Sequence, residues 1–321
     1  MTREAAGRSP TRVQIVLAFA ALYLVGGSIF LGQRVVMHGG FTAFLASGVR
    51  MLLAGGVLLG WSVARGGRIA PRSAWLDLAI SGGLLFVGGN ALSMIASETV
   101  DSGLVALLTA TCPFWLTLGA ARLPGGDRPS GLAVFGIALG FAGLAIIVVP
   151  TLQGGGSATA ILAAAISPIA WAAGGLWARH RLSALSPMTI ASHQMLFGAA
   201  PLLAIGVARG ELAHLAPTGD AVLALGYLIV LGNLISYRAF VFLMRHVAAA
   251  KVSTYAYVNP IVAVWLGAWL AGERIPPRSL IGAAAILAGV VLAHLAQVTR
   301  RGSTALPIAR RSPQPQQGAL P

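Results

Sequence analysis

The sequence is short of charged residues, of acidic residues in particular, and of cysteine. Only 9% of its 321 residues are charged and 8 are acidic, whereas 57% are hydrophobic and the mean hydropathy is +0.82. A soluble domain of this length needs more charge to cover its surface, so this composition excludes an ordinary soluble fold. The single cysteine, Cys112, excludes a disulfide framework.

Motifs for catalysis or metal binding are also missing from the sequence. Ser28 and Ser47 stand near glycines but lack a Gly-x-Ser-Gly frame, and the sequence has no His-x-x-x-His pair or cluster of Cys and His. We therefore expect neither an enzyme nor a protein with a cofactor or metal. A membrane-embedded enzyme stays the rival class, and a channel is a further alternative, although no charged ring or filter-like sequence is apparent.

Long apolar segments are what the sequence has in abundance. Each is about 20 residues long, which is the length a helix needs to cross the ~30 Å hydrocarbon core of a bilayer. Strand-like alternation is absent, so helices must satisfy the backbone hydrogen bonds. The ten segments are residues 13–33, 41–63, 75–97, 102–121, 131–150, 158–178, 188–208, 219–243, 248–271 and 279–298. We predict an all-α integral membrane protein with ten transmembrane helices in contact with the lipid bilayer.

The net charge of +14 is distributed over loops and tails, and this distribution predicts the topology. The basic residues do not form a soluble patch with interleaved aromatics, so we expect no nucleic-acid partner. Most of the 22 Lys and Arg residues fall in alternate loops on the side of the N-terminus, as expected of cytoplasmic loops. We predict a multi-pass protein of a bacterial cell (inner) membrane with both termini in the cytoplasm.

An internal repeat relates the two halves of the chain. Pairing Pro113 with Pro260 superimposes residues 102–115 on residues 249–262. The other matched features are the turns Gly126-Asp127-Arg128 and Gly272-Glu273-Arg274, the glycines Gly136 and Gly143 with Gly282 and Gly289, Tyr23 with Trp171, and Arg50 with Gln194. The repeat divides the ten helices into five and five.

Five is an odd number, so the second half must enter the membrane from the opposite side. We predict two inverted five-helix repeats, residues 13–151 and 158–298, preceded by a cytoplasmic segment, residues 1–12, and followed by a disordered cytoplasmic tail, residues 299–321. Inverted repeats can exchange conformations and so open a central site alternately to each side of the membrane.

These features together resemble the drug/metabolite transporter superfamily, in its ten-helix EamA-type branch. The resemblance runs from Val13 to Val298, and its motifs are residues 21–28, residues 50–54, Pro113, Trp171-Ala172, His193-Gln194, Asn259-Pro260, and the ending from Gly272-Glu273-Arg274 to Gly282 and Gly289. It implies a secondary transporter, monomeric or homodimeric, that exports amino acids, related metabolites or drugs. Gly26 departs from the family pattern, which commonly has tryptophan there, and Asp127 lies one residue later than the usual glutamate.

Inverted repeats of this kind are expected to bind their small-molecule substrate near the membrane midplane, where polar side chains are costly to bury. The residues we select for a central cavity are Tyr23, Arg50, Asn90, Trp171, His193, Gln194, Tyr237 and Tyr257. Ser93, Asn233, Arg238, Tyr255 and Asn259 also fall within helices.

Each selected residue has a structural alternative. Arg50 could bind an anionic group of the substrate, because arginine makes bidentate bonds to carboxylates, or it could tie the two halves together. His193 could carry a proton or could be a packed, hydrogen-bonded residue. The aromatics could line a cavity or simply pack. Since no carboxylate stands at mid-depth, exchange, facilitated diffusion and a histidine-based step all stay open as coupling modes.

Overall fold

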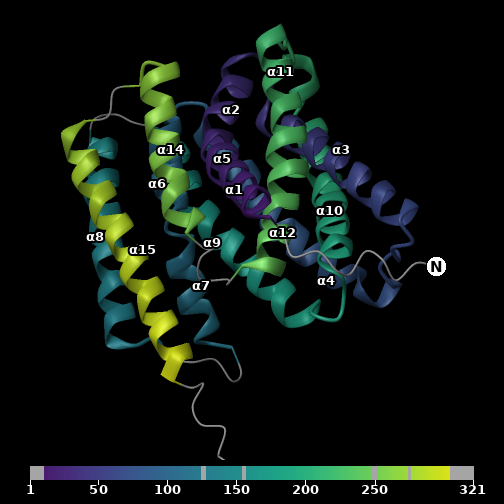
Figure 1. Cartoon of the computed structure of the whole chain (residues 1–321). Helices are drawn as coiled ribbons and strands as arrows, with labels where there is room; N and C mark the ends of the chain where they lie inside the picture. Colours follow the sequence, from purple (N-terminus) through teal and green to yellow (C-terminus); the bar gives the residue numbers. More distant parts are fainter. Residues whose placement is uncertain are drawn as a thin grey trace, which may run out of the picture.

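The computed structural model describes residues 11–123, 128–153, 157–247, 252, 254–273 and 276–303, and its regular elements are helices (Figure 1). Nine of the described helical spans are long and apolar enough to cross a membrane, and a tenth apolar helix, Tyr257–Leu270, is shorter. The prediction of an all-α membrane protein with ten helices is confirmed.

The first half contains five spans. They are α1, η2 and α2 (Arg12–Ala20, Ala21–Val25, Gly26–His38); α3 (Ala43–Ala64); η3, α4, η4 and α5 (Arg72–Ala74, Trp75–Gly82, Gly83–Ala91, Leu92–Ala96); α6 and α7 (Ser102–Thr109, Cys112–Ala120); and α8 (Gly131–Gln153).

The second half repeats this order. Its spans are α9 (Ala158–Arg181); α10 (Pro187–Ala208) with the short η5 (Glu211–His214) after it; α11, η6 and α12 (Gly219–Tyr227, Leu228–Ile235, Ser236–His246); α14 (Tyr255–Leu270); and α15 (Pro277–Ser303). The expected tail boundary after residue 298 therefore falls inside α15, and residues 304–321 lie outside the described part of the chain, as do residues 1–10.

Two of the spans contain a long π-helical segment at the same place in each half. These segments are η4 and η6, and both contain a Gly-Asn pair, Gly89-Asn90 and Gly232-Asn233. A π-helix inserts an extra residue into a turn, which often marks a functional site. Helical periodicity alone did not predict these segments, because an apolar π turn has the same composition as an apolar α turn.

Corresponding helices of the two halves pack against each other as pairs. The α8 and α15 helices lie side by side at one edge of the molecule (Figure 1). A Cβ atom on Gly136 would lie 2.7 Å from the carbonyl oxygen of Gly289, and one on Gly282 would lie 2.7 Å from that of Gly143. Because Gly136 corresponds to Gly282 and Gly143 to Gly289, the two close contacts are related by the internal symmetry. Small residues permit this approach where lipid provides no hydrophobic drive for association.

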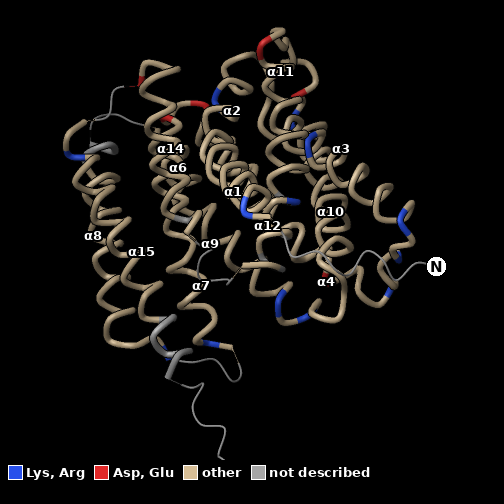
Figure 2. The backbone as a smooth tube through the Cα atoms, viewed as in Figure 1, with Lys and Arg blue, Asp and Glu red and all other residues tan. Residues whose placement is uncertain are grey.

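Charge separates the two ends of the bundle. Acidic residues gather at the upper end in Figure 2, where α2, α5, α10 and α14 end. We call this the acidic end, and it carries Glu98, Asp101, Glu211, Asp220 and Glu273. The opposite, basic end carries Arg65, Arg68, Arg72, Arg122, Arg179 and Arg181. The positive-inside rule predicts that the basic end faces the cytoplasm.

Candidate functional site

A cavity of about 540 Å³ lies between the two halves. Four spans of each half contribute to its lining, whereas α8 and α15 contribute none of the described lining residues. The π-helical segments η4 and η6 both contribute to the lining, and both Gly-Asn pairs belong to it. The cavity is therefore built around the interface that the inverted repeat creates.

Arg50 and Asn233 join the two halves at the wall of this cavity. Asn233 Oδ1 accepts hydrogen bonds from Arg50 Nε at 2.9 Å and from Arg50 Nη2 at 2.6 Å. Both side chains are buried, with Arg50 only 3% exposed. The Asn233 amide nitrogen lies 3.6 Å from the sulfur of Met51. Arg50 thus serves as a tie between the halves, and it also lines the cavity.

The symmetry-related pair is arranged differently. Gln194 corresponds to Arg50, and Asn90 corresponds to Asn233, yet Gln194 Nε2 donates to Ser81 Oγ at 2.9 Å. The side-chain oxygen of Asn90 is buried and has no hydrogen-bond partner among the described residues. The polar lining is therefore asymmetric, although the helices that carry it are related by the repeat.

Aromatic side chains form much of the remaining wall. Phe86 and Trp171 make an edge-to-face pair with ring centroids 6.1 Å apart, and Phe240 and Tyr255 make another at the same distance. Phe30 lines the cavity as well. Such rings offer a flat apolar surface of fixed shape to an organic group.

The match to known proteins agrees with this arrangement. The sequence model of the EamA-like transporter family matches residues 12–149 and, a second time, residues 158–295. The chain belongs to the EamA-like transporter family. The predicted resemblance is thereby confirmed, and the protein is a membrane permease.

Several relatives of this EamA-like permease have transporter names. The "Uncharacterized inner membrane transporter YedA" of Escherichia coli K12 is 33% identical over 279 residues, which cover 87% of this chain and 90% of the relative. The "Uncharacterized transporter YvbV" of Bacillus subtilis is 22% identical over 88% of this chain and 92% of the relative. A "S-adenosylmethionine/S-adenosylhomocysteine transporter" of Chlamydia trachomatis is 26% identical, covering 87% and 88% respectively.

A solved structure described as "Crystal structure of protein" shares the fold of this permease. It aligns with a TM-score of 0.60 at 21% identity, over 90% of this chain and 99% of the solved chain. The family and the named relatives are transporters. No cluster of three or more His, Cys, Asp or Glu side chains that could hold a metal ion occurs in the described residues.

Four of the eight residues selected from the sequence line the cavity of the permease, namely Arg50, Asn90, Trp171 and Gln194. Tyr23 lies outside the lining and its hydroxyl bonds the Thr254 hydroxyl at 2.5 Å. Tyr257 packs beside the α8 and α15 pair, with its ring 6.4 Å from that of His294. The side chain of Tyr237 lies outside what the structure describes.

His193 is placed behind the cavity, toward the basic end. Its Nε2 accepts a hydrogen bond from the backbone N–H of Ala70 at 3.2 Å, and its Nδ1 lies 2.8 Å from the Thr189 carbonyl. A neutral imidazole with its proton on Nδ1 satisfies both contacts, so this geometry favours the hydrogen-bonded packing alternative over proton transport.

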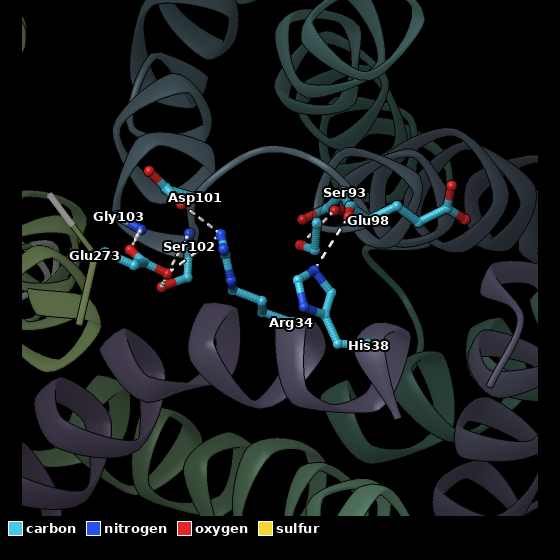
Figure 3. A network of polar contacts seen from close by, with 9 residues as sticks. Arg34, His38, Ser93, Glu98, Asp101, Ser102, Gly103 and Glu273 are labelled. Carbon is cyan, nitrogen blue, oxygen red and sulfur yellow. Dashed lines mark hydrogen bonds and ion pairs between the residues drawn. The ribbon is translucent and has the colours of Figure 1, made fainter. Parts of the chain in front are cut away.

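Polar contacts that begin at the cavity join the helices at the acidic end of the permease. Ser93 Oγ donates to Gln33 Oε1 at 3.0 Å, and both residues line the cavity. Beyond them, Arg34 Nη1 bonds Asp101 at 2.6 Å and lies 3.5 Å from Glu273, while His38 Nε2 lies 3.1 Å from the Glu98 carbonyl (Figure 3). These contacts connect α2 to the turn between α5 and α6.

Two carboxylates of the second half cap helices of the first half at this end. Glu273 accepts hydrogen bonds from the backbone N–H of Ser102 at 2.9 Å, from its hydroxyl at 2.7 Å and from Gly103 N–H at 3.2 Å (Figure 3). Glu211 accepts from Leu45 N–H at 3.0 Å. A carboxylate at a helix N-terminus satisfies free N–H groups and complements the helix dipole. The two caps fasten the halves together at the acidic end.

Glu98 lies at the same end of the molecule, and its surroundings shift its pKa. Desolvation by its surroundings raises the pKa of Glu98 above its ordinary value, the charge of Glu211 raises it further, and Arg209 lowers it. These surroundings therefore disfavour the ionised form of this carboxyl group.

The sequence contains a pattern that identifies Asn233 as a cavity residue, although the position of a residue along its helix does not reveal it. The pairs Gly89-Asn90 and Gly232-Asn233 occupy corresponding places in the two halves, and their repetition identifies both asparagines at once. Gln33 had no such signal, because it stands at the predicted edge of the first helix, whereas α2 continues to His38.

Proposed function

We propose that this permease carries a small metabolite across a bacterial inner membrane by alternating access, with the solute bound in the central cavity. The main support is that the cavity lies between two inverted halves and that hydrogen bonds join the same halves at its acidic end. Release of the Arg34 and Glu273 contacts would open the cavity on that side. The basic end faces the cytoplasm, as do both termini.

Export of amino acids or related metabolites is the direction and solute class we propose. The cavity volume suits a solute of that size, and its aromatic wall suits an apolar side chain. One relative, 26% identical, is named for S-adenosylmethionine and S-adenosylhomocysteine, and this name supports a metabolite as the solute.

The test is flux in proteoliposomes against a panel of amino acids, other metabolites and cationic drugs, with and without a pH gradient. A carrier gives saturable flux and accelerated counterflow of labelled solute when unlabelled solute is trapped inside. A channel gives no accelerated counterflow. An enzyme would convert the solute, which chromatography of the recovered material detects. Absence of flux for every solute would contradict the proposal.

A leucine at Gly232 is expected to block this flux. A Cβ atom there would lie 3.5 Å from Arg50 Nη2 and from Ile29, which is ordinary contact, so a small side chain is accommodated and the rest of a leucine occupies the cavity. We expect Gly232→Leu to lower solute flux at least about tenfold, equivalent to about 1.4 kcal/mol. Gly226→Leu is the matched control, because a Cβ on this exposed glycine of the same span meets nothing within 4 Å. Equal flux in both variants would place the solute elsewhere.

A further inference from the structure

Among the described residues, the lining of the central cavity includes two buried polar atoms of opposite kind that have no hydrogen-bond partner. Arg50 Nη1 is a hydrogen-bond donor and Asn90 Oδ1 is an acceptor, and neither is bonded within the described part of the chain. Both side chains line the cavity and both are more than nine-tenths buried. The two atoms themselves have almost no accessible surface, so a solute reaches them when the side chains that cover them move. An unpaired buried polar group raises the free energy of the folded state. A solute that offers an acceptor and a donor can recover this free energy.

The origin of the two free atoms is the broken symmetry of the lining. The side-chain oxygen of Asn233 accepts hydrogen bonds from Nε and Nη2 of Arg50, so Asn233 does not bond the third nitrogen, Nη1. Asn90, at the corresponding place in the other half, faces no arginine, because Gln194 stands there and is bonded to Ser81. One half therefore supplies a spare donor and the other a spare acceptor.

Charge makes the donor the stronger of the two determinants. Arg50 is the only charged side chain among the described residues that line the cavity. A guanidinium does not lose its proton in proteins, and the amide of Asn233 does not neutralise it. An unpaired cation at membrane depth is costly, so an entering anion gains both a charge partner and a hydrogen bond.

We propose that the cavity selects solutes that carry a carboxylate and, on the same molecule, a hydrogen-bond donor, with Arg50 Nη1 binding the carboxylate and Asn90 Oδ1 accepting from the donor. This inference rests on the proposed function, because it places the solute in the same cavity. An α-amino acid with an apolar side chain offers a carboxylate to Arg50, an ammonium group to Asn90 and an apolar group to the aromatic wall.

Three probes that share one ring and chain separate the two contacts. L-Phenylalanine has both groups, 3-phenylpropionate has only the carboxylate, and phenethylamine has only the amine. Calorimetry measures binding of each probe to the purified full-length protein in nanodiscs. We expect the tightest binding for phenylalanine, weaker binding for phenylpropionate and no binding for phenethylamine.

Four variants assign the contacts to residues. Arg50→Gln is expected to abolish binding of both carboxylates, and Arg50→Lys, which keeps the charge, to weaken both at least about tenfold by losing the fixed fork of donors. Asn90→Leu is expected to remove the advantage of phenylalanine over phenylpropionate while leaving phenylpropionate unchanged. Ser62→Ala is the control, because Ser62 lies on α3, the helix that carries Arg50, but outside the cavity lining. Size-exclusion profiles compare folding, and Arg50→Lys and Asn90→Leu keep the test decisive if Arg50→Gln does not fold.

The outcomes distinguish this inference from the proposed function. Binding of phenethylamine as tight as that of phenylalanine, unchanged binding in folded Arg50 variants, or no binding of either carboxylate would overturn the inference. Flux of a cationic or neutral solute that Gly232→Leu blocks would overturn the inference and keep the permease proposal. Absence of flux for every solute would overturn both.

Discussion

Replacing Gly143 by leucine is expected to remove most of the correctly folded permease. A Cβ atom at this buried position would lie 2.5 Å from the carbonyl oxygen of Gly282 and 2.9 Å from the backbone nitrogen of Ile286. These are backbone atoms of α15, so no side chain can rotate away and the two helices must separate. Overpacking of this kind costs about 1–3 kcal/mol, and more where packing partners are lost with it.

The loss would extend beyond the contact itself. Phe114, Ile147 and Ile286 belong to the buried cluster at the α8 and α15 pair, and each is at most 1% exposed. Separation of the helices would open this cluster. The measurement is the yield of monodisperse protein in size-exclusion chromatography together with its thermal midpoint. Gly131→Leu is the matched control on α8, because a Cβ there meets nothing within 4 Å. Equal behaviour of the two variants would refute the close packing of this pair.

Replacing Glu273 by alanine is expected to open the acidic end of the cavity. The carboxylate is 1% exposed and accepts three hydrogen bonds from Ser102 and Gly103, besides lying 3.5 Å from Arg34. Without it, two backbone N–H groups at the start of α6 lose their acceptor, and Arg34 keeps only Asp101. Each lost contact to a charged group is worth about 1.5–3 kcal/mol, so the balance between closed and open states should shift by at least about tenfold.

The single cysteine of the chain reports this opening directly. Cys112 lines the central cavity, and the protein has no other thiol. In right-side-out vesicles, an impermeant maleimide added outside should label Cys112 at least about tenfold faster in Glu273→Ala than in the wild type. Asp220→Ala, an exposed acid at the same end, should label at the wild-type rate, and Cys112→Ser should not label. Unchanged labelling of folded Glu273→Ala would mean that Glu273 does not hold the cavity closed.

The membrane fold was predictable because lipid imposes a simple rule on the backbone. Every apolar block of about 20 residues must satisfy its own hydrogen bonds, so each becomes a helix wherever it lies in the bundle. Several helices are longer in the structure than the predicted segments, whereas α14 is shorter. The α2 helix runs to His38 rather than residue 33, which brings Arg34 into the closure at the acidic end.

The candidate site was predictable only in part, because depth along a helix does not determine which way a side chain points. Arg50 and Tyr257 were both selected by depth, yet Arg50 lines the cavity and Tyr257 packs against the α8 and α15 cluster. The rotation of each helix is decided by its neighbours, and the π-helical segments η4 and η6 change that rotation along one span.

The sequence by itself determined the number of helices, the inverted duplication and the family, since these depend on hydrophobic length, loop charge and repeated motifs that are local in the chain. Only the tertiary structure decided that Arg50 is bonded to Asn233, that Gly143 meets Gly282, and that Glu273 caps α6. Each of these contacts joins residues from different halves, and no local pattern specifies how two apolar helices rotate and cross. The scarcity of charged residues is visible in the sequence, but only the tertiary structure shows that Arg50 is the single charged side chain among the described residues of the cavity.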